Sequence, residues 1–155
     1  MMSREHRAES VLRIGGVASI PSVLRGLGCD PREVLGEAGI DPALFDDPEN
    51  RIPFARLGEL LAFCVARTGC KHFGLLVGQG GGASSLGLVG FLALHSPDVE
   101  SALRTLVRYL HHHDRGAVPT LAIVEGSAAL GYAIYQPHIA ASEQIVDGAL
   151  AVGCN

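Results

Sequence analysis

Apolar residues recur at helical spacing in two segments of the chain. From Pro53 onward one stripe predicts a helix with a single face against the core, ended by Gly69. Ser96-Pro97-Asp98 is typical of a helix start and precedes the second stripe, whose outer face carries charged residues four positions apart. The stripes are Phe54, Leu57, Leu60, Leu61, Cys64 and Val65, and then Val99, Leu103, Leu106, Val107 and Leu110, the latter opposite Glu100, Arg104 and Arg108.

The N-terminal third predicts a compact helical region. Asp30 and Asp41 stand directly before a proline and Ser19 stands two positions before one, the pattern of a capping residue followed by proline in the first helical turn. Gly28 and Gly39 follow the first two short helices and supply the left-handed conformation common after a helix. A short strand is expected before them, within residues 11–17.

The middle of the chain is rich in glycine. A helix over residues 72–77 runs into GQGGGASS, where glycines are too dense for regular structure, so a loop is expected. The run LGLVGFLAL over residues 86–94 predicts a buried helix in which Gly87 and Gly90 allow close approach of neighbouring backbone. A buried strand is the competing interpretation, because short apolar runs are ambiguous by periodicity.

The last forty or so residues predict a hairpin and a final helix. Residues 118–124 and 130–135 are rich in strand formers and flank the turn Glu125-Gly126-Ser127. Helical spacing resumes over residues 142–152. The expected fold class is therefore α+β, a mostly helical domain with a β-hairpin or small antiparallel sheet that ends at or just after a C-terminal helix. The length of 155 residues suits a single domain over 1–155.

Composition and charge narrow the class of protein. A hydrophobic content of 48% supports a packed core, and a net charge of −4 with scattered basic residues argues against nucleic-acid binding by this chain. The four cysteines lack C-x-x-C spacing, which favours reduced thiols over a zinc site. Residues 1–13 do not resemble a signal peptide, and no segment has the apolar length of a membrane span. A cytoplasmic location is expected, with no membrane partner.

Two motifs suggest chemistry that their spacing does not support. His111, His112 and His113 are consecutive, so on a helix their side chains point about 100° apart, whereas helical metal ligands need spacings of three or four. GQGGGASS matches neither a Walker loop nor a dinucleotide-binding fingerprint. No nucleophile, base and orienting residue can be assembled, so no catalytic residue, metal or cofactor is expected.

A third constellation suggests a ligand pocket. Tyr109, His112, Tyr132, Tyr135 and Glu143 lie near the predicted junction of the long helix, the hairpin and the terminal helix. Polar groups converging beside an aliphatic wall are typical of small-molecule sites. The alternative is that the tyrosines face solvent and the histidine caps a helix.

Several segments together resemble a known family. AGIDPALFDDPENRIP, HFGLLVGQ, SSLGLVGFLALHSP, ALRTLVRYLHHHDRGAVPTL and LGYAIYQP are similar to successive parts of the N-terminal effector-sensing, arabinose-binding-like domain of AraC-type bacterial transcriptional regulators. The resemblance implies a domain that binds a small effector or mediates dimerisation. It also implies a C-terminal pair of helix-turn-helix units that binds the promoter. Because the family pattern continues beyond Asn155, the sensory domain is expected to be incomplete here and the DNA-binding domain to lie outside this chain.

Two functions therefore remain. The first is an effector-sensing and dimerisation module, not an enzyme, with a small molecule and a second copy of the chain as partners. The second is a small metal- or cofactor-dependent enzyme that uses the cluster from His111 to His113. Nothing in the sequence selects a sugar over an amino acid or an aromatic acid as the effector.

Overall fold

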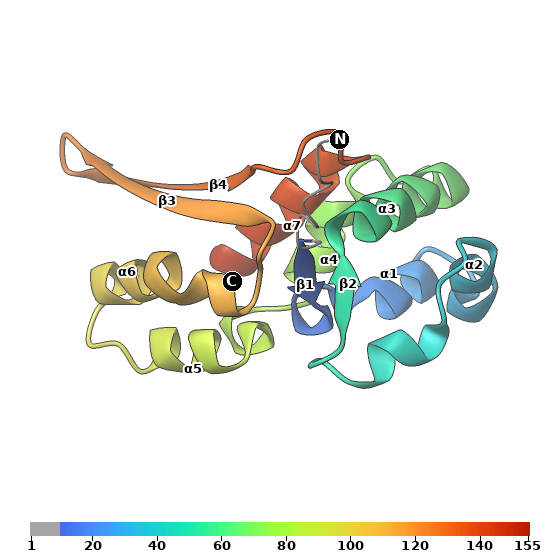
Figure 1. The fold of residues 1–155 in the computed structure, drawn as a ribbon, viewed down its shortest axis with the longest axis horizontal. Coiled ribbons are helices and arrows are strands. Elements are labelled where there is room, and N and C mark those ends of the chain that lie inside the picture. Colours follow the sequence, from blue (N-terminus) through green and yellow to red (C-terminus); the bar gives the residue numbers. More distant parts are fainter. Residues whose placement is uncertain (1–9) are drawn as a thin grey trace, which may run out of the picture.

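A computed structural model describes residues 10–155 and confirms the α+β class (Figure 1). Seven α-helices accompany two antiparallel pairs of strands in the described part of the chain, with 3-10 turns between some of them. The expectation about a signal peptide falls mainly on residues 1–9, which are outside the described residues. The elements are β1 (Val11–Arg13), α1 (Ile20–Gly26), α2 (Pro31–Glu37), β2 (Arg51–Pro53), α3 (Phe54–Thr68), α4 (Phe73–Gln79), α5 (Leu88–Leu94), α6 (Val99–Tyr109), β3 (Ala117–Val124), β4 (Ser127–Ile134) and α7 (Ser142–Gly153).

The predicted helix starts at Asp30 and Asp41 are confirmed, the second opening a 3-10 turn, whereas Ser19 precedes α1 but its hydroxyl donates to the Val77 carbonyl and does not cap the helix. The Asp30 carboxylate accepts a hydrogen bond from the Arg32 backbone N–H at 2.8 Å, and Asp41 does the same for Ala43 at 2.9 Å. Gly28 and Gly39 adopt positive φ. The expected strand over residues 11–17 is shorter than predicted, because it turns into a 3-10 helix at Ile14–Val17, where the glycine pair lies.

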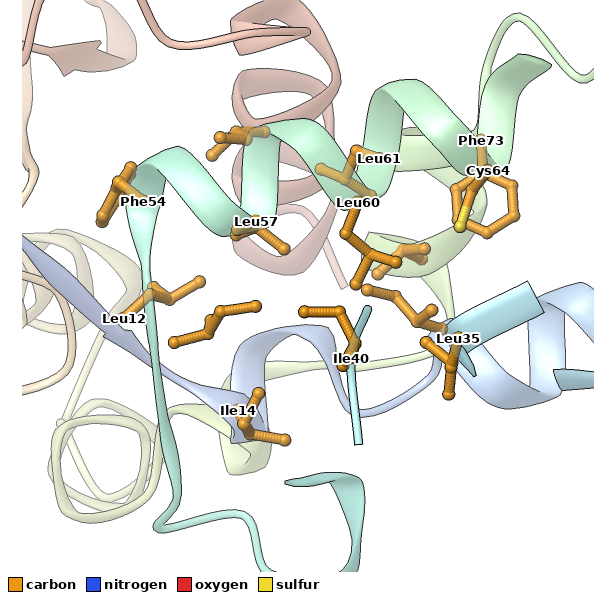
Figure 2. Packing of buried hydrophobic residues seen from close by; sticks show 14 of the residues in the cluster. Leu12, Ile14, Leu35, Ile40, Phe54, Leu57, Leu60, Leu61, Cys64 and Phe73 are labelled. Carbon is orange, nitrogen blue, oxygen red and sulfur yellow. The ribbon is translucent and has the colours of Figure 1, made fainter. Parts of the chain in front are cut away.

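The main hydrophobic core lies under α3 (Figure 2). The predicted stripe of α3 is buried at every position except Val65, which is partly buried, and Gly69 ends the helix with φ of 71°. Residues of β1, β2, α1, α2 and α4 share the core with this stripe, among them Leu12, Leu35 and Phe73, as do Ile14 in the following 3-10 turn and Ile40 just after α2. A second, smaller cluster contains Leu86, Leu110 and Val152, with Leu106 and Tyr132 against it.

The predicted hairpin and last helix are confirmed, although β4 begins at Ser127, three residues earlier than predicted. Strands β3 and β4 pair antiparallel with Pro119 opposite Tyr132. Glu125 and Gly126 both have positive φ, the geometry of the two-residue turn that matches strand twist. The hairpin lies over α6 and reaches back to α7 (Figure 1). Tyr132 packs against both hydrophobic clusters.

The predicted burial of α5 and α6 is wrong on part of each helix. Residues 86–94 do form a helix from Leu88, but Leu88, Phe91, Leu92 and Leu94 are 73%, 55%, 42% and 62% exposed. On α6, no residue is buried and Val99 is 75% exposed, although Leu110 just beyond it is buried. The two helices pair with each other at one end of the molecule, where the rest of the chain covers only one side of α5 (Figure 1).

The prediction that Gly90 allows close approach of neighbouring backbone is confirmed, since a Cβ there would overlap the carbonyl of Ala83. No single helix among the described residues is long and apolar enough to span a membrane. Helices α3 and α4 together have the length and composition of a span, but the chain bends by 109° between them.

Candidate functional site

A pocket lies between the two hydrophobic clusters. Its volume is about 90 Å³, several times the ~10–15 Å³ that one water needs. We call it the central pocket. Its walls are mainly aliphatic and come from β1, α3, α4, α6, α7 and the hairpin, including Leu12, Leu61, Leu106, Leu110, Leu130 and Ile145.

Three polar residues, His113, Asp114 and Tyr132, contribute to the lining of this apolar pocket. The side chains of His113 and Asp114 are only 3% and 1% exposed. The Tyr132 hydroxyl donates to one carboxylate oxygen of Asp114, and the Gly116 backbone N–H donates to the other at 2.7 Å. A buried polar group is tolerated only when it is hydrogen-bonded, and the carboxylate meets this requirement.

Backbone pairing holds these residues in place. The segment that follows α6 runs antiparallel to β1: the Arg13 N–H donates to the His113 carbonyl at 3.0 Å, and the Arg115 N–H donates to the Val11 carbonyl at 3.1 Å. Because β1 also pairs with β2, the polar residues sit on a small fixed sheet. The histidine and the aspartate are therefore positioned by main-chain hydrogen bonds and not only by side-chain packing.

The His113 ring is fixed by an arginine. Its Nδ1 lies 3.2 Å from a guanidinium nitrogen of Arg13, which is itself buried and paired with Glu49. An arginine can only donate, so Nδ1 accepts and the ring proton of the neutral histidine is assigned to Nε2. Burial, together with the positive charges of Arg13 and Arg51, lowers the pKa of His113 to about 4.

The neighbouring carboxyl shifts in the opposite direction. Burial raises the pKa of Asp114 to about 6, although the hydrogen bonds from Tyr132 and from backbone N–H groups favour the ionised form. Burial likewise raises the pKa of the Tyr132 hydroxyl above its usual range, and the charge of Asp114 adds to this effect. At neutral pH this part of the pocket therefore holds a neutral histidine, a neutral tyrosine and an ionised aspartate.

One further polar residue of the lining has a structural task. The side-chain amide of Gln144 in α7 donates to the Lys71 carbonyl at 2.8 Å and accepts from the Gly74 N–H at 2.8 Å. The N-cap residue of α4 makes no side-chain hydrogen bond to the start of the helix. Gln144 satisfies one of the free backbone N–H groups there. This glutamine joins α7 to α4.

The structure brings only one of the five residues predicted from the sequence to the central pocket. Tyr132 lines it, whereas Tyr109, His112, Tyr135 and Glu143 do not. Tyr109 and His112 are close to each other, with ring centroids 6.4 Å apart, and His112 is exposed. Tyr135 is 59% exposed and donates to the Arg115 carbonyl, and Glu143 is exposed in the first turn of α7.

Sequence reasoning missed His113 and Asp114 as pocket residues. A signal was present, since continuing the helical stripe from Leu106 and Leu110 by three or four residues reaches His113 and Asp114, not His112. The three histidines separate in the structure: His111 and His112 are exposed with ring centroids 4.1 Å apart, while His113 is buried. Within residues 10–155, no three His, Cys, Asp or Glu side chains gather closely enough to hold a metal ion.

Comparison with protein families identifies one that matches most of the chain. The family described as the arabinose-binding domain of AraC transcription regulator, N-terminal, matches residues 28–153. The match covers the central helices, the hairpin, α7 and the three polar residues of the central pocket. It begins after β1 and α1, so Arg13 lies outside it. No curated protein matches the chain.

Proposed function

The chain belongs to the family of N-terminal arabinose-binding domains of AraC transcription regulators, and we propose that it senses a small-molecule effector in the central pocket to control transcription. The observation that carries this proposal is a cavity with aliphatic walls from β1, four helices and the hairpin around His113, Asp114 and Tyr132. An apolar pocket with a few convergent polar groups and shifted pKa values is the usual form of a ligand site.

The remaining parts of the proposal follow the family. The chain is a regulatory domain and not an enzyme, it acts in the cytoplasm, and promoter binding belongs to a helix-turn-helix domain outside these residues. The net charge of −4 supports this division, because binding to DNA phosphates needs clustered basic residues. The alternative enzyme with a metal at His111 to His113 receives no support from the geometry, because His113 is buried beside Arg13 whereas His111 and His112 are exposed.

Effector binding predicts a specific effect of filling the pocket. Ala149 lines it, so in Ala149→Leu added methyl groups occupy ligand space. A thermal-shift screen of small metabolites is expected to find stabilising compounds, since a ligand at a hundred times its Kd stabilises by about 2.7 kcal/mol. Calorimetry should then show binding at least tenfold weaker in Ala149→Leu.

The matched control is the same substitution on the exposed hairpin surface, Ala122→Leu, which should keep wild-type affinity. Equal affinities in both variants would contradict binding in the central pocket. In that case the outer group of Tyr109, His112 and Tyr135 predicted from the sequence becomes the site to test, with His112→Ala as the first variant.

A homodimer is also part of the proposal. The outward side of α5 exposes Leu88, Phe91, Leu92 and Leu94, a grouping that soluble monomers seldom leave uncovered. A second copy of the chain covers it most simply, since family members of this kind are expected to dimerise. Sedimentation velocity should show a dimer that Phe91→Asp converts to a monomer, and an unchanged dimer in this variant would exclude this face.

A further inference from the structure

The polar groups of the central pocket limit the chemistry of the effector, if the proposed function holds. His113 is 97% buried, and its Nδ1 is taken by Arg13. Among the residues that the structure describes, no hydrogen bond joins Nε2 to a protein acceptor, and Nε2 lies beside Gly16, another residue of the pocket lining. A Cβ on Gly16 would come within 2.8 Å of this nitrogen, so only glycine lets the ring lie this close to that backbone. An N–H donor with no protein acceptor therefore remains in the pocket.

The pocket also holds acceptors. The Tyr132 hydroxyl uses its hydrogen on Asp114, which leaves its oxygen lone pairs able to accept. The carboxylate oxygens of Asp114 receive the tyrosine hydroxyl and backbone N–H groups, and each oxygen can accept a second hydrogen bond. One donor and at least one acceptor thus occupy neighbouring positions, beside walls that offer only apolar contact.

Three kinds of ligand fit this arrangement poorly. A carboxylate could accept from His113 but would bring a second negative charge to the buried Asp114. An ammonium group could donate to Asp114 but would point its hydrogens at the N–H of His113. A pentose or hexose carries hydroxyls around the whole ring, and the aliphatic walls would leave most of them without partners.

We propose that the effector is an apolar molecule with one neutral head group that both donates and accepts a hydrogen bond, such as an alcohol or a primary amide. The head group accepts from His113 Nε2 and donates to Asp114 or Tyr132, while the apolar body fills the space between Leu12, Leu106 and Ile145. Sites that hydrogen-bond a ligand's polar group discriminate strongly against analogues that lack it, whereas apolar walls discriminate weakly.

Four probes with the same carbon chain test this assignment: hexanol, hexanamide, hexanoate and hexylamine. Calorimetry near pH 7.5, where Asp114 is ionised, is expected to show hexanol and hexanamide binding at least tenfold more tightly than the two charged probes. In Asp114→Asn, which removes the charge and keeps the shape, hexanoate should gain relative to hexanol. His113→Asn should weaken hexanol several-fold, and His111→Asn, a change at an exposed neighbour, should not.

Each contrary outcome has a defined meaning. Binding of a charged probe as tight as hexanol, an unchanged preference in Asp114→Asn, or binding of none of the four overturns the head-group assignment. If a charged probe binds and Ala149→Leu abolishes that binding, the effector pocket stands and only the head group is wrong. If Ala149→Leu leaves probe binding intact, both the head-group assignment and the proposed effector binding in the central pocket are wrong.

The ring proton of His113 can be located without a ligand. Nitrogen NMR of the His113 ring is expected to show an unprotonated Nδ1 and a protonated Nε2 at neutral pH. A proton on Nδ1 would remove the donor from the pocket and overturn the assignment, whatever the stability of the variants.

Discussion

Gly78→Ala is expected to destabilise the fold by about 3 kcal/mol or more, the upper end of the usual cost of overpacking. Helices α4 and α7 are in contact through backbone at Gly74, Gly78 and Gly148. A Cβ on Gly78 would lie less than 3.0 Å from the Gly148 carbonyl oxygen and from the side chain of Ala151. Backbone cannot move aside as a flexible side chain can, so the two helices must separate. Because α7 lines the central pocket, this separation would also disturb the candidate site.

Gly36→Ala is the matched control. Gly36 lies inside α2, and a Cβ there meets no atom within 4 Å. Alanine favours helix more than glycine does, so this variant should be neutral or more stable by about 0.4–1 kcal/mol. Urea unfolding of both variants measures the difference. Equal midpoints for Gly78→Ala and Gly36→Ala would show that α4 and α7 do not pack as described.

The buried histidine and aspartate should give opposite dependences of stability on pH. The pKa of His113 falls from 6.5 to about 4. Its contribution to the free energy of unfolding is therefore present above pH 6.5 and is lost as pH falls through 4. The pKa of Asp114 rises from 3.8 to about 6, so its contribution is present below pH 3.8 and is lost as pH rises through 6. Each shift of about two units corresponds to about 3 kcal/mol.

Between pH 4 and 6 these two contributions offset each other in the wild type. His113→Asn removes the contribution of the histidine. The free energy of unfolding of the wild type, relative to that of this variant, should therefore increase by about 3 kcal/mol as pH rises from 4 to 6.5. Relative to Asp114→Asn, the free energy of unfolding of the wild type should decrease by a similar amount as pH rises from 4 to 6. Denaturant unfolding at several pH values measures both, with His111→Asn as the exposed control. Parallel pH profiles for the wild type and both variants would mean that neither group is buried as described.

Local signals predicted most of the secondary structure. Some features depend only on residues close together in the sequence and can be predicted from it. They are the capping aspartates before proline, the glycines at positive φ and the turn Glu125-Gly126. The stripe of α3 was also predictable, because that helix lies across the main core. The first strand was harder, since the residues following it form a 3-10 turn.

Burial at the end of the molecule was not predictable in the same way. The residues of α5 are apolar on nearly every side, and periodicity cannot say which side the rest of the chain covers. Val89 and Ala93 face inward, while Leu88 and Phe91 are exposed. That outcome depends on where the hairpin and α6 lie, and hence on contacts between distant segments.

The candidate site was predictable only in part. Tyr132 was identified because it lies on the best hairpin of the sequence, and the structure brings it to the central pocket. The sequence prediction named His112, whereas His113, one position later, continues the helical stripe and lines the pocket. The role of Arg13 could not be foreseen, because it depends on β1 pairing with the segment a hundred residues later.

A crystal structure of the protein with bound hexanol tests the central claim most directly. The account predicts the ligand in the central pocket, with its hydroxyl within hydrogen-bond distance of His113 and of Asp114 or Tyr132, and its carbon chain against Leu106 and Ile145. A ligand bound on the outer surface beside Tyr109 and His112, with the central pocket empty, would contradict it.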